Sequence, residues 1–195
     1  ATAEVKALID AADIYYIAGF FLTVCVDGIL QVAQQAASQE KIFCFNLSAP
    51  FIPEFFGDQL AQVLPYVDIL FSNEDEARAY AKKNNLGTED VAEIAAILVK
   101  FEKATKKPRT VVFTQGKDPT IVATPDGITR HNVEKLEESM LVDTNGAGDA
   151  FVGGFLAYLA QGAAIDVCCQ AGHYSARTII QHSGCTFPAA PEFKA

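Results

Sequence analysis

Residues 141–156 read Leu-Val-Asp-Thr-Asn-Gly-Ala-Gly-Asp-Ala-Phe-Val-Gly-Gly-Phe-Leu, and the interpretation of the whole chain starts from this stretch. Two apolar residues lead into a run of small residues that only a tight turn tolerates. From Ala150 onward, apolar residues recur at helical spacing. The pattern predicts the end of a strand, then a glycine turn, then the start of a helix.

The predicted turn is chemically suited to an anion. The first N–H groups of a helix have no partner inside the helix, and the helix dipole places partial positive charge there. Gly146 and Gly148 leave the backbone open to a phosphate and permit the positive φ values that aim successive N–H groups at one point. Asp149 is the exception, because a carboxylate repels phosphate. Asp149 could either stabilise the first turn of the helix or act as a base that accepts a proton from an attacking hydroxyl.

The run from Asp143 to Phe155 resembles the signature of the ribokinase-like superfamily of sugar and nucleoside kinases, and within it the branch that phosphorylates adenosine. The resemblance implies that Gly146, Ala147 and Gly148 form an anion hole for phosphate. It also implies that Asn145 contacts ATP and that Asp149 is the catalytic base.

The resemblance covers nearly the whole chain, in order, but only the C-terminal part of such kinases. It implies an α/β fold of the ribokinase-like layered type, with a mainly parallel central sheet flanked by helices. The N-terminal part and the lid of that fold are expected to be missing. Residues 1–195 are then the C-terminal part of a single kinase domain, with the ATP-binding side and the base.

Composition narrows the class of protein. Half of the 195 residues are hydrophobic, which suits one globular domain, and a net charge of −9 argues against nucleic acid as a partner. We find no apolar run near the ~20 residues that cross a bilayer and no signal peptide, so we expect no membrane partner and a cytoplasmic location, with the nucleus also open. The five cysteines show neither disulfide nor metal-ligand spacing, and we expect reduced thiols.

Alternating strand and helix patterns support the α/β expectation. Strands are expected at 12–19, 41–46, 67–71 and 110–113, a hairpin at 121–131, and helices at 27–39, 53–64, 73–87, 88–104, 150–162 and 165–181.

Phe20 follows the first predicted strand, at the sheet edge where ligands bind in open parallel sheets. From the residues alone, its ring either stacks on a purine or belongs to the core. The resemblance implies that it lines the nucleoside pocket.

Asn73 precedes Glu76 by three positions at a predicted helix start, which is the spacing of a capping box. The resemblance adds a second role, because ribokinase-like kinases use an Asn-x-x-Glu motif to organise Mg²⁺ and its waters near the phosphates. The two roles are compatible, since Mg²⁺ keeps several waters and takes few protein oxygens. Asn73 is then an ATP contact, and Glu76 holds the metal through water.

Thr114 and Gly116 follow a strand in a turn that either touches phosphate or is an ordinary connection. His173 lies on a largely apolar helix, where a histidine is usually a packed core residue. The resemblance implies that all three bind ATP, His173 at the adenine. Members of the family tend to carry a glutamine that touches the nucleoside where this chain has Glu138, which puts that contact in doubt.

These observations lead to one expected function and two alternatives. The expected function is ATP-dependent phosphorylation of adenosine at its 5′-hydroxyl, giving AMP and ADP, with Mg²⁺ as cofactor and a monomeric full-length enzyme. The alternatives are a ribokinase-like kinase with another substrate and a truncated, non-catalytic nucleotide-binding module.

Overall fold

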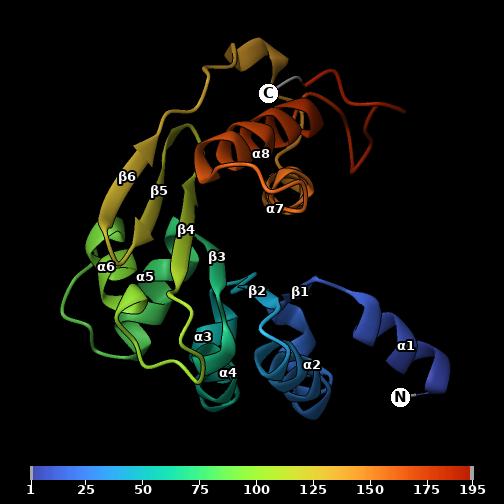
Figure 1. Ribbon diagram of the computed structural model, residues 1–195. Coiled ribbons are helices and arrows are strands. Elements are labelled where there is room, and N and C mark those ends of the chain that lie inside the picture. The colour runs from blue at the N-terminus through green and yellow to red at the C-terminus, as the bar shows by residue number, and fades with distance from the viewer. Residues whose placement is uncertain (1, 194–195) are drawn as a thin grey trace. The chain divides into compact units, whose positions relative to one another are not determined.

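The computed structural model describes residues 2–193, and its central element is one six-stranded sheet in the order β1-β2-β3-β4-β5-β6 (Figure 1). The strands are β1 (Ile14–Ala18), β2 (Ile42–Asn46), β3 (Ile69–Asn73), β4 (Thr110–Gln115), β5 (Asp118–Thr124) and β6 (Gly127–His131). The α-helices are α1 (Ala3–Ala11), α2 (Val26–Ser38), α3 (Phe51–Phe55), α4 (Gly57–Val63), α5 (Glu74–Lys83), α6 (Val91–Val99), α7 (Ala147–Leu159) and α8 (Ile165–Ile179). Three 3₁₀ turns, η1 (Gly19–Thr23), η2 (Leu64–Tyr66) and η3 (Glu138–Met140), complete the described elements.

The pairing of the strands follows from their connections. β1 pairs with β2 in parallel, and β2 pairs with β3 in parallel, each pair being joined through helices as parallel strands require. Only two residues separate β4 from β5 and β5 from β6, and a connection that short joins antiparallel neighbours. The predicted α/β fold and the predicted hairpin are confirmed.

The chain divides into two compact units. The first contains residues 1–113 and 121–129, and the second contains residues 114–120 and 130–195. Among residues 2–193, no helix is long and apolar enough to cross a bilayer.

The core of the first unit lies around β2 and β3, whose side chains are buried on both faces. Phe43, Phe45 and Leu70 are fully buried, as are Ile29 of α2 and Leu98 of α6. This burial explains the near-continuous apolar runs of these strands, which are typical of a sheet covered on both sides.

Arg109 is a charged residue inside this core, with 1% of its surface exposed. Its guanidinium donates to the carbonyls of Leu64, Val67 and Leu98, and it also reaches those of Phe101 and Glu102. One side chain therefore binds backbone carbonyls at the ends of both η2 and α6, and these hydrogen bonds satisfy the buried guanidinium.

Arg109 also explains one error of the sequence-based prediction. The helix expected at 88–104 is α6, which begins at Val91, after Asp90 accepts the backbone N–H of Glu93 at 2.9 Å. The helix ends at Val99, because the carbonyls beyond it turn toward the buried guanidinium.

Two further helix boundaries differ from the prediction. The helix expected at 53–64 is interrupted at Phe56, whose backbone leaves the helical region and whose side chain packs against the core, so that α3 and α4 are separate. The helix expected to end at Gly87 ends at Lys83, because Asn85 already adopts a left-handed backbone with φ 53°. Pro53 lies in the first turn of α3.

The second unit is built on α7 and α8, which pack side by side (Figure 1). Their approach depends on Gly154, where a Cβ atom would come within 2.4 Å of both the Ala171 carbonyl oxygen and the Ser175 hydroxyl oxygen. No other residue fits this crossing without moving the helices apart. The helix pair is therefore a closely packed base for the turn that precedes α7.

Candidate functional site

The turn before α7 has the backbone geometry of an anion site. Gly146 is the N-cap of the helix and adopts a left-handed backbone with φ 78°. The left-handed conformation favours glycine, and a Cβ atom at this position would also lie 2.8 Å from the Cys185 sulfur, which would have to move.

Three backbone donors remain open at this turn. The N–H of Ala147 donates to Thr144, and that of Ala150 donates to the Gly146 carbonyl. The N–H groups of Gly146, Gly148 and Asp149 have no acceptor among residues 2–193. An anion near the start of α7 would accept hydrogen bonds from these N–H groups. It would also interact favourably with the positive end of the helix dipole.

Two details of this region differ from the prediction. Residues 141–142 are not a strand, because the N–H groups of Val142 and Asp143 both donate to the Ile180 carbonyl at the end of α8. The helix begins at Ala147 and not at Ala150, which places Gly148 and Asp149 inside its first turn. Gly148 does not have the positive φ that was expected of it, since its backbone is already helical.

Asp149 is an exposed carboxylate in this first turn, next to the open donors. An acidic residue there interacts favourably with the helix dipole, and its exposure also leaves it open to a ligand hydroxyl. The geometry is compatible with both roles derived from the sequence.

Asp143 fixes the shape of the turn, a role that the sequence analysis missed. One carboxylate oxygen accepts the N–H of Asn145 at 2.9 Å, and the other accepts the N–H of Gly184 at 3.2 Å. These bonds lower the pKa of Asp143 below its ordinary value, because they favour the ionised form. The signal in the sequence is an aspartate two residues before an N–H that its side chain accepts, the pattern of an Asx-turn.

His173 lies on α8 and is partly buried. Its Nε2 atom is 2.8 Å from the Thr120 hydroxyl, and its ring centroid is 5.4 Å from that of Phe151. Burial, and then the nearby His131, lower the pKa of His173 to about 4. The imidazole is therefore neutral at neutral pH and suits an aromatic or hydrogen-bonding contact better than a phosphate contact.

His173 also lines a pocket of about 230 Å³ within the second unit. This volume is below the ~300–1,000 Å³ of pockets that hold a whole drug-sized ligand, so the pocket suits one ring system of a larger molecule. An ion pair between Arg177 and Glu134 lies in its wall. The lining residues are Asn132, Val133, Glu134, Gln170, His173, Tyr174, Arg177 and Phe193.

Thr114 and Gly116 lie at the hairpin between β4 and β5. Thr114 is within β4, and Gly116, with φ 57°, is the first of the two connecting residues. The turn predicted after a strand is therefore a hairpin turn, which Gln115 supports by donating from its side chain to the Pro119 carbonyl.

In the first unit, the structure confirms the capping box at the start of α5. The Asn73 side chain accepts the N–H of Glu76 at 2.8 Å, and the Glu76 carboxylate accepts the N–H of Asn73 at 3.0 Å. Glu76 is only 5% exposed, and burial raises its pKa. Hydrogen bonds from Asn73, the Ser72 side chain and the Ser48 backbone act in the opposite direction, because they favour the ionised form.

Ser48 joins the ends of three neighbouring strands, and the sequence analysis did not identify it. Its hydroxyl accepts the N–H of Gly19 after β1, and its own N–H donates to the Asn46 side chain at the end of β2. Its backbone also contributes a hydrogen bond to Glu76, after β3. These contacts hold the carboxyl ends of β1, β2 and β3 together.

Phe20 lies in η1, directly after β1, and is 52% exposed. Its ring centroid is 6.1 Å from that of Phe51. The Phe20 ring is therefore not enclosed in the core of the first unit. Glu138 lies in η3 and is exposed.

Comparison with known proteins gives a consistent result. The family model described as pfkB family carbohydrate kinase matches residues 1–192. The chain is 48% identical to adenosine kinase 2 of Arabidopsis thaliana over 188 residues, which is 96% of this chain and 54% of the relative. It is 44% identical to the adenosine kinase of Dictyostelium discoideum over 190 residues, covering 97% of this chain and 56% of the relative.

Solved structures agree with the sequence matches. The Anopheles gambiae adenosine kinase in complex with P1,P4-di(adenosine-5) tetraphosphate superposes with a TM-score of 0.94 and 46% identity, covering 98% of this chain and 57% of that one. The Schistosoma mansoni adenosine kinase in complex with adenosine and AMP gives 0.89 and 35%, covering 96% and 56%. The chain spans about half the length of the relatives it matches.

Proposed function

This chain belongs to the pfkB family of carbohydrate kinases, and we propose that it carries the ATP-binding side and the catalytic base of an adenosine kinase. The proposed reaction transfers the γ-phosphoryl group of ATP to the 5′-hydroxyl of adenosine and gives AMP and ADP. The names of the relatives, at up to 48% identity, support adenosine as the substrate.

The observation that carries the proposal is the first turn of α7. Its open N–H groups, at Gly146, Gly148 and Asp149, suit the oxygens of a transferring phosphoryl group. Asp149 supplies a carboxylate in the same turn, which accepts the proton that the attacking hydroxyl loses. Phosphoryl transfer needs little more from the protein than such positioning and charge stabilisation.

The proposed adenine site of ATP is the pocket beside His173. Its neutral imidazole and the ring of Tyr174 offer apolar faces, while Asn132 and Gln170 offer amide groups for the edge of a base. We assign further ATP contacts to Asn73, Thr114, Gly116 and Asn145, and adenosine contact to the exposed ring of Phe20. A cytoplasmic, monomeric full-length enzyme is part of the same proposal.

The residues present fit Mg²⁺ in a water-mediated role. The Glu76 carboxylate already accepts hydrogen bonds from Asn73, Ser72 and Ser48, so direct ligation would have to break some of them. Residues 2–193 contain no cluster of three acidic, histidine or cysteine side chains able to hold a metal alone. Mg²⁺ that keeps its waters and binds substrate phosphates needs no such cluster. When bound, the ion neutralises charge on the ATP phosphates.

The test of the proposal is Asp149→Asn in a chimera in which residues 1–195 replace the matching part of the plant relative described above. We expect turnover to AMP to fall at least ~10²-fold while ATP binding is kept, because the amide preserves shape and removes the base. Asp27→Asn is the control, since Asp27 is also an exposed aspartate in the first turn of a helix. Near-normal turnover in Asp149→Asn would return Asp149 to a helix-stabilising role.

The role of Mg²⁺ is tested by Glu76→Gln in the same chimera. Glutamine can still complete the capping box, so the fold should persist while the Mg²⁺ concentration for half-maximal rate rises several-fold. Asp75→Asn, an exposed change in the same helical turn, should leave the Mg²⁺ titration unchanged. An unaltered titration in Glu76→Gln would limit Glu76 to capping.

A further inference from the structure

The segment that follows α8, residues 184–193, is fastened to the second unit at both of its ends. This tail segment begins at the phosphate turn, the turn of residues 143–149 at the start of α7 to which the proposed function assigns the phosphates. There the Gly184 N–H donates to Asp143 and the Cys185 sulfur lies against Gly146. It ends at the pocket, where the Phe193 ring is part of the wall. The segment therefore connects the two places that the proposed function assigns to the phosphates and the base of ATP.

The attachment at the pocket is aromatic. The Phe193 ring lies edge-on to Tyr158 of α7, with centroids 5.1 Å apart and planes at 86°, and its centroid is 5.5 Å from that of Tyr174 of α8. The backbone N–H of Glu192 donates to the Tyr174 hydroxyl at 2.9 Å. Such ring pairs each change an equilibrium by a factor of about 2 to 10 beyond the area they bury.

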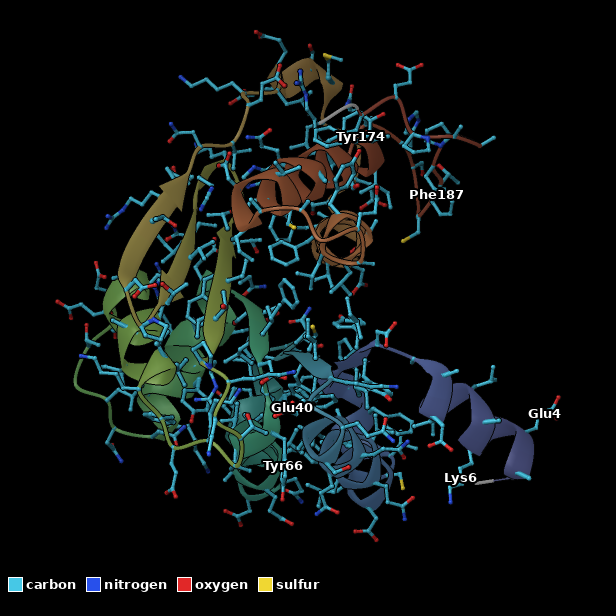
Figure 2. All side chains as sticks on the ribbon, viewed as in Figure 1. Glu4, Lys6, Glu40, Tyr66, Tyr174 and Phe187 are labelled. Atoms are coloured by element: carbon cyan, nitrogen blue, oxygen red, sulfur yellow. The ribbon has the colours of Figure 1, made fainter. Side chains whose placement is uncertain are left out.

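Another phenylalanine of the tail segment behaves differently. Phe187 is 78% exposed, and Figure 2 shows it on the tail, whereas Tyr174 lies on α8. Two phenylalanines six positions apart thus differ in environment, and only Phe193 contributes to the pocket. A general need for hydrophobic residues in the tail segment does not explain this difference.

We propose that Phe193 is a positioning residue of the nucleotide site, which holds the tail segment as the wall of the base pocket through Tyr158 and Tyr174. The proposal rests on the proposed function, because it takes the pocket to be the place of the ATP base. Phe193 then contributes to the selectivity for a ligand that carries a base. Loss of its ring should leave the phosphate turn unaffected, because the tail segment is bound there separately through Gly184.

The test compares two probes on the 195-residue chain, MgATP and magnesium tripolyphosphate, which has the phosphates without a base. Ligand-observed NMR titrations measure both dissociation constants. Phe193→Ala should weaken MgATP about tenfold and change tripolyphosphate less than about twofold. Phe187→Ala, the matched control, should change neither. Melting temperatures verify folding, and Phe193→Leu replaces the alanine variant if that variant unfolds.

A second variant tests whether Phe193 acts through its neighbours. Tyr158 touches Phe193 but does not line the pocket. Tyr158→Leu should weaken MgATP binding in the same direction and should add nothing in the Phe193→Ala background, because both changes release the same ring. Additive effects of the two substitutions would contradict the positioning role.

The outcomes separate the two proposals. If the wild-type chain prefers MgATP over tripolyphosphate and Phe193→Ala keeps that preference, the role of Phe193 is wrong and the proposed function stands. If the wild-type chain shows no preference for MgATP, the pocket is not a base site, and both the adenine assignment and the role of Phe193 are overturned.

Discussion

Gly146 and Gly148 occupy the same short turn and are glycines for different reasons. Gly146 adopts a left-handed backbone and lies against Cys185, so the fold itself disfavours a side chain there. Gly148 has a helical backbone, and a Cβ atom there would meet nothing within 4 Å. Folding therefore does not require a glycine at position 148. We attribute the glycine to its position beside the open N–H groups of the turn.

Alanine substitution at the two positions should separate these reasons. Gly146→Ala should lower the free energy of unfolding by about 1–2 kcal/mol from the left-handed backbone, and by more if Cys185 cannot move. Gly148→Ala should leave the free energy of unfolding unchanged or raise it by up to about 1 kcal/mol, because alanine favours the helix. Urea unfolding followed by circular dichroism measures both. Equal stability of the two variants would contradict the geometry assigned to Gly146.

At the scale of the element, α8 combines structural and ligand-facing roles. At one end of the helix, the Ile180 carbonyl accepts the backbone N–H groups of Val142 and Asp143. These hydrogen bonds hold the segment that leads into the phosphate turn. Its middle part carries His173 and Tyr174 into the pocket wall. Displacement of α8 would therefore affect both parts of the proposed ATP site.

The lowered pKa of His173 predicts a pH dependence of stability. The folded state holds the imidazole neutral down to about pH 4, whereas in the unfolded chain it gains a proton near pH 6.5. Below pH 6.5 the unfolded state binds more protons, so the stability contributed above that pH is lost as pH falls from about 6.5 toward 4.

His173→Gln should flatten this part of the curve, measured as urea midpoints between pH 4 and 7. His182→Gln is the control, since His182 lies beyond α8 and outside the pocket lining. An unchanged slope in His173→Gln would show that the imidazole is not held neutral.

At the scale of the whole molecule, the chain spans about half the length of its relatives. The proposed substrate-side residue, Phe20, is 52% exposed. β1 lies at one edge of the described sheet and pairs there only with β2. An open strand edge and exposed aromatic residues favour association with other chains.

We expect the 195-residue chain by itself to bind MgATP weakly and to form no measurable AMP from adenosine and MgATP. Positioning of the hydroxyl is worth up to ~7–11 kcal/mol in such reactions, and the nucleoside contact proposed for this chain is the exposed side chain of Phe20. A coupled assay for ADP measures the rate, with the chimera as the positive control. Turnover within about tenfold of the ~10 s⁻¹ typical of enzymes would contradict this expectation.

Features that depend on neighbours in the sequence were predictable. The capping box of Asn73 and Glu76 involves residues three positions apart, and the structure reproduces it. The strands of the sheet and the hairpin were also found, because apolar runs and a Pro-Asp-Gly turn are local signals. The helix start at Ala147 was misplaced by three residues, since a glycine in the first helical turn reads like part of the preceding loop.

Features that depend on distant partners came only from the tertiary structure. The Arg109 guanidinium donates to carbonyls that include that of Leu64, 45 positions away, and the His173 ring lies 2.8 Å from the hydroxyl of Thr120, 53 positions away. Sequence periodicity does not reveal such pairs, because it shows which face of an element is apolar and not which residues pack against that face. The sequence by itself determined the class of fold, the glycine turn and its aspartate. The burial of Glu76, the neutral state of His173 and the fastening of Phe193 follow from packing, which removes water and brings distant groups together.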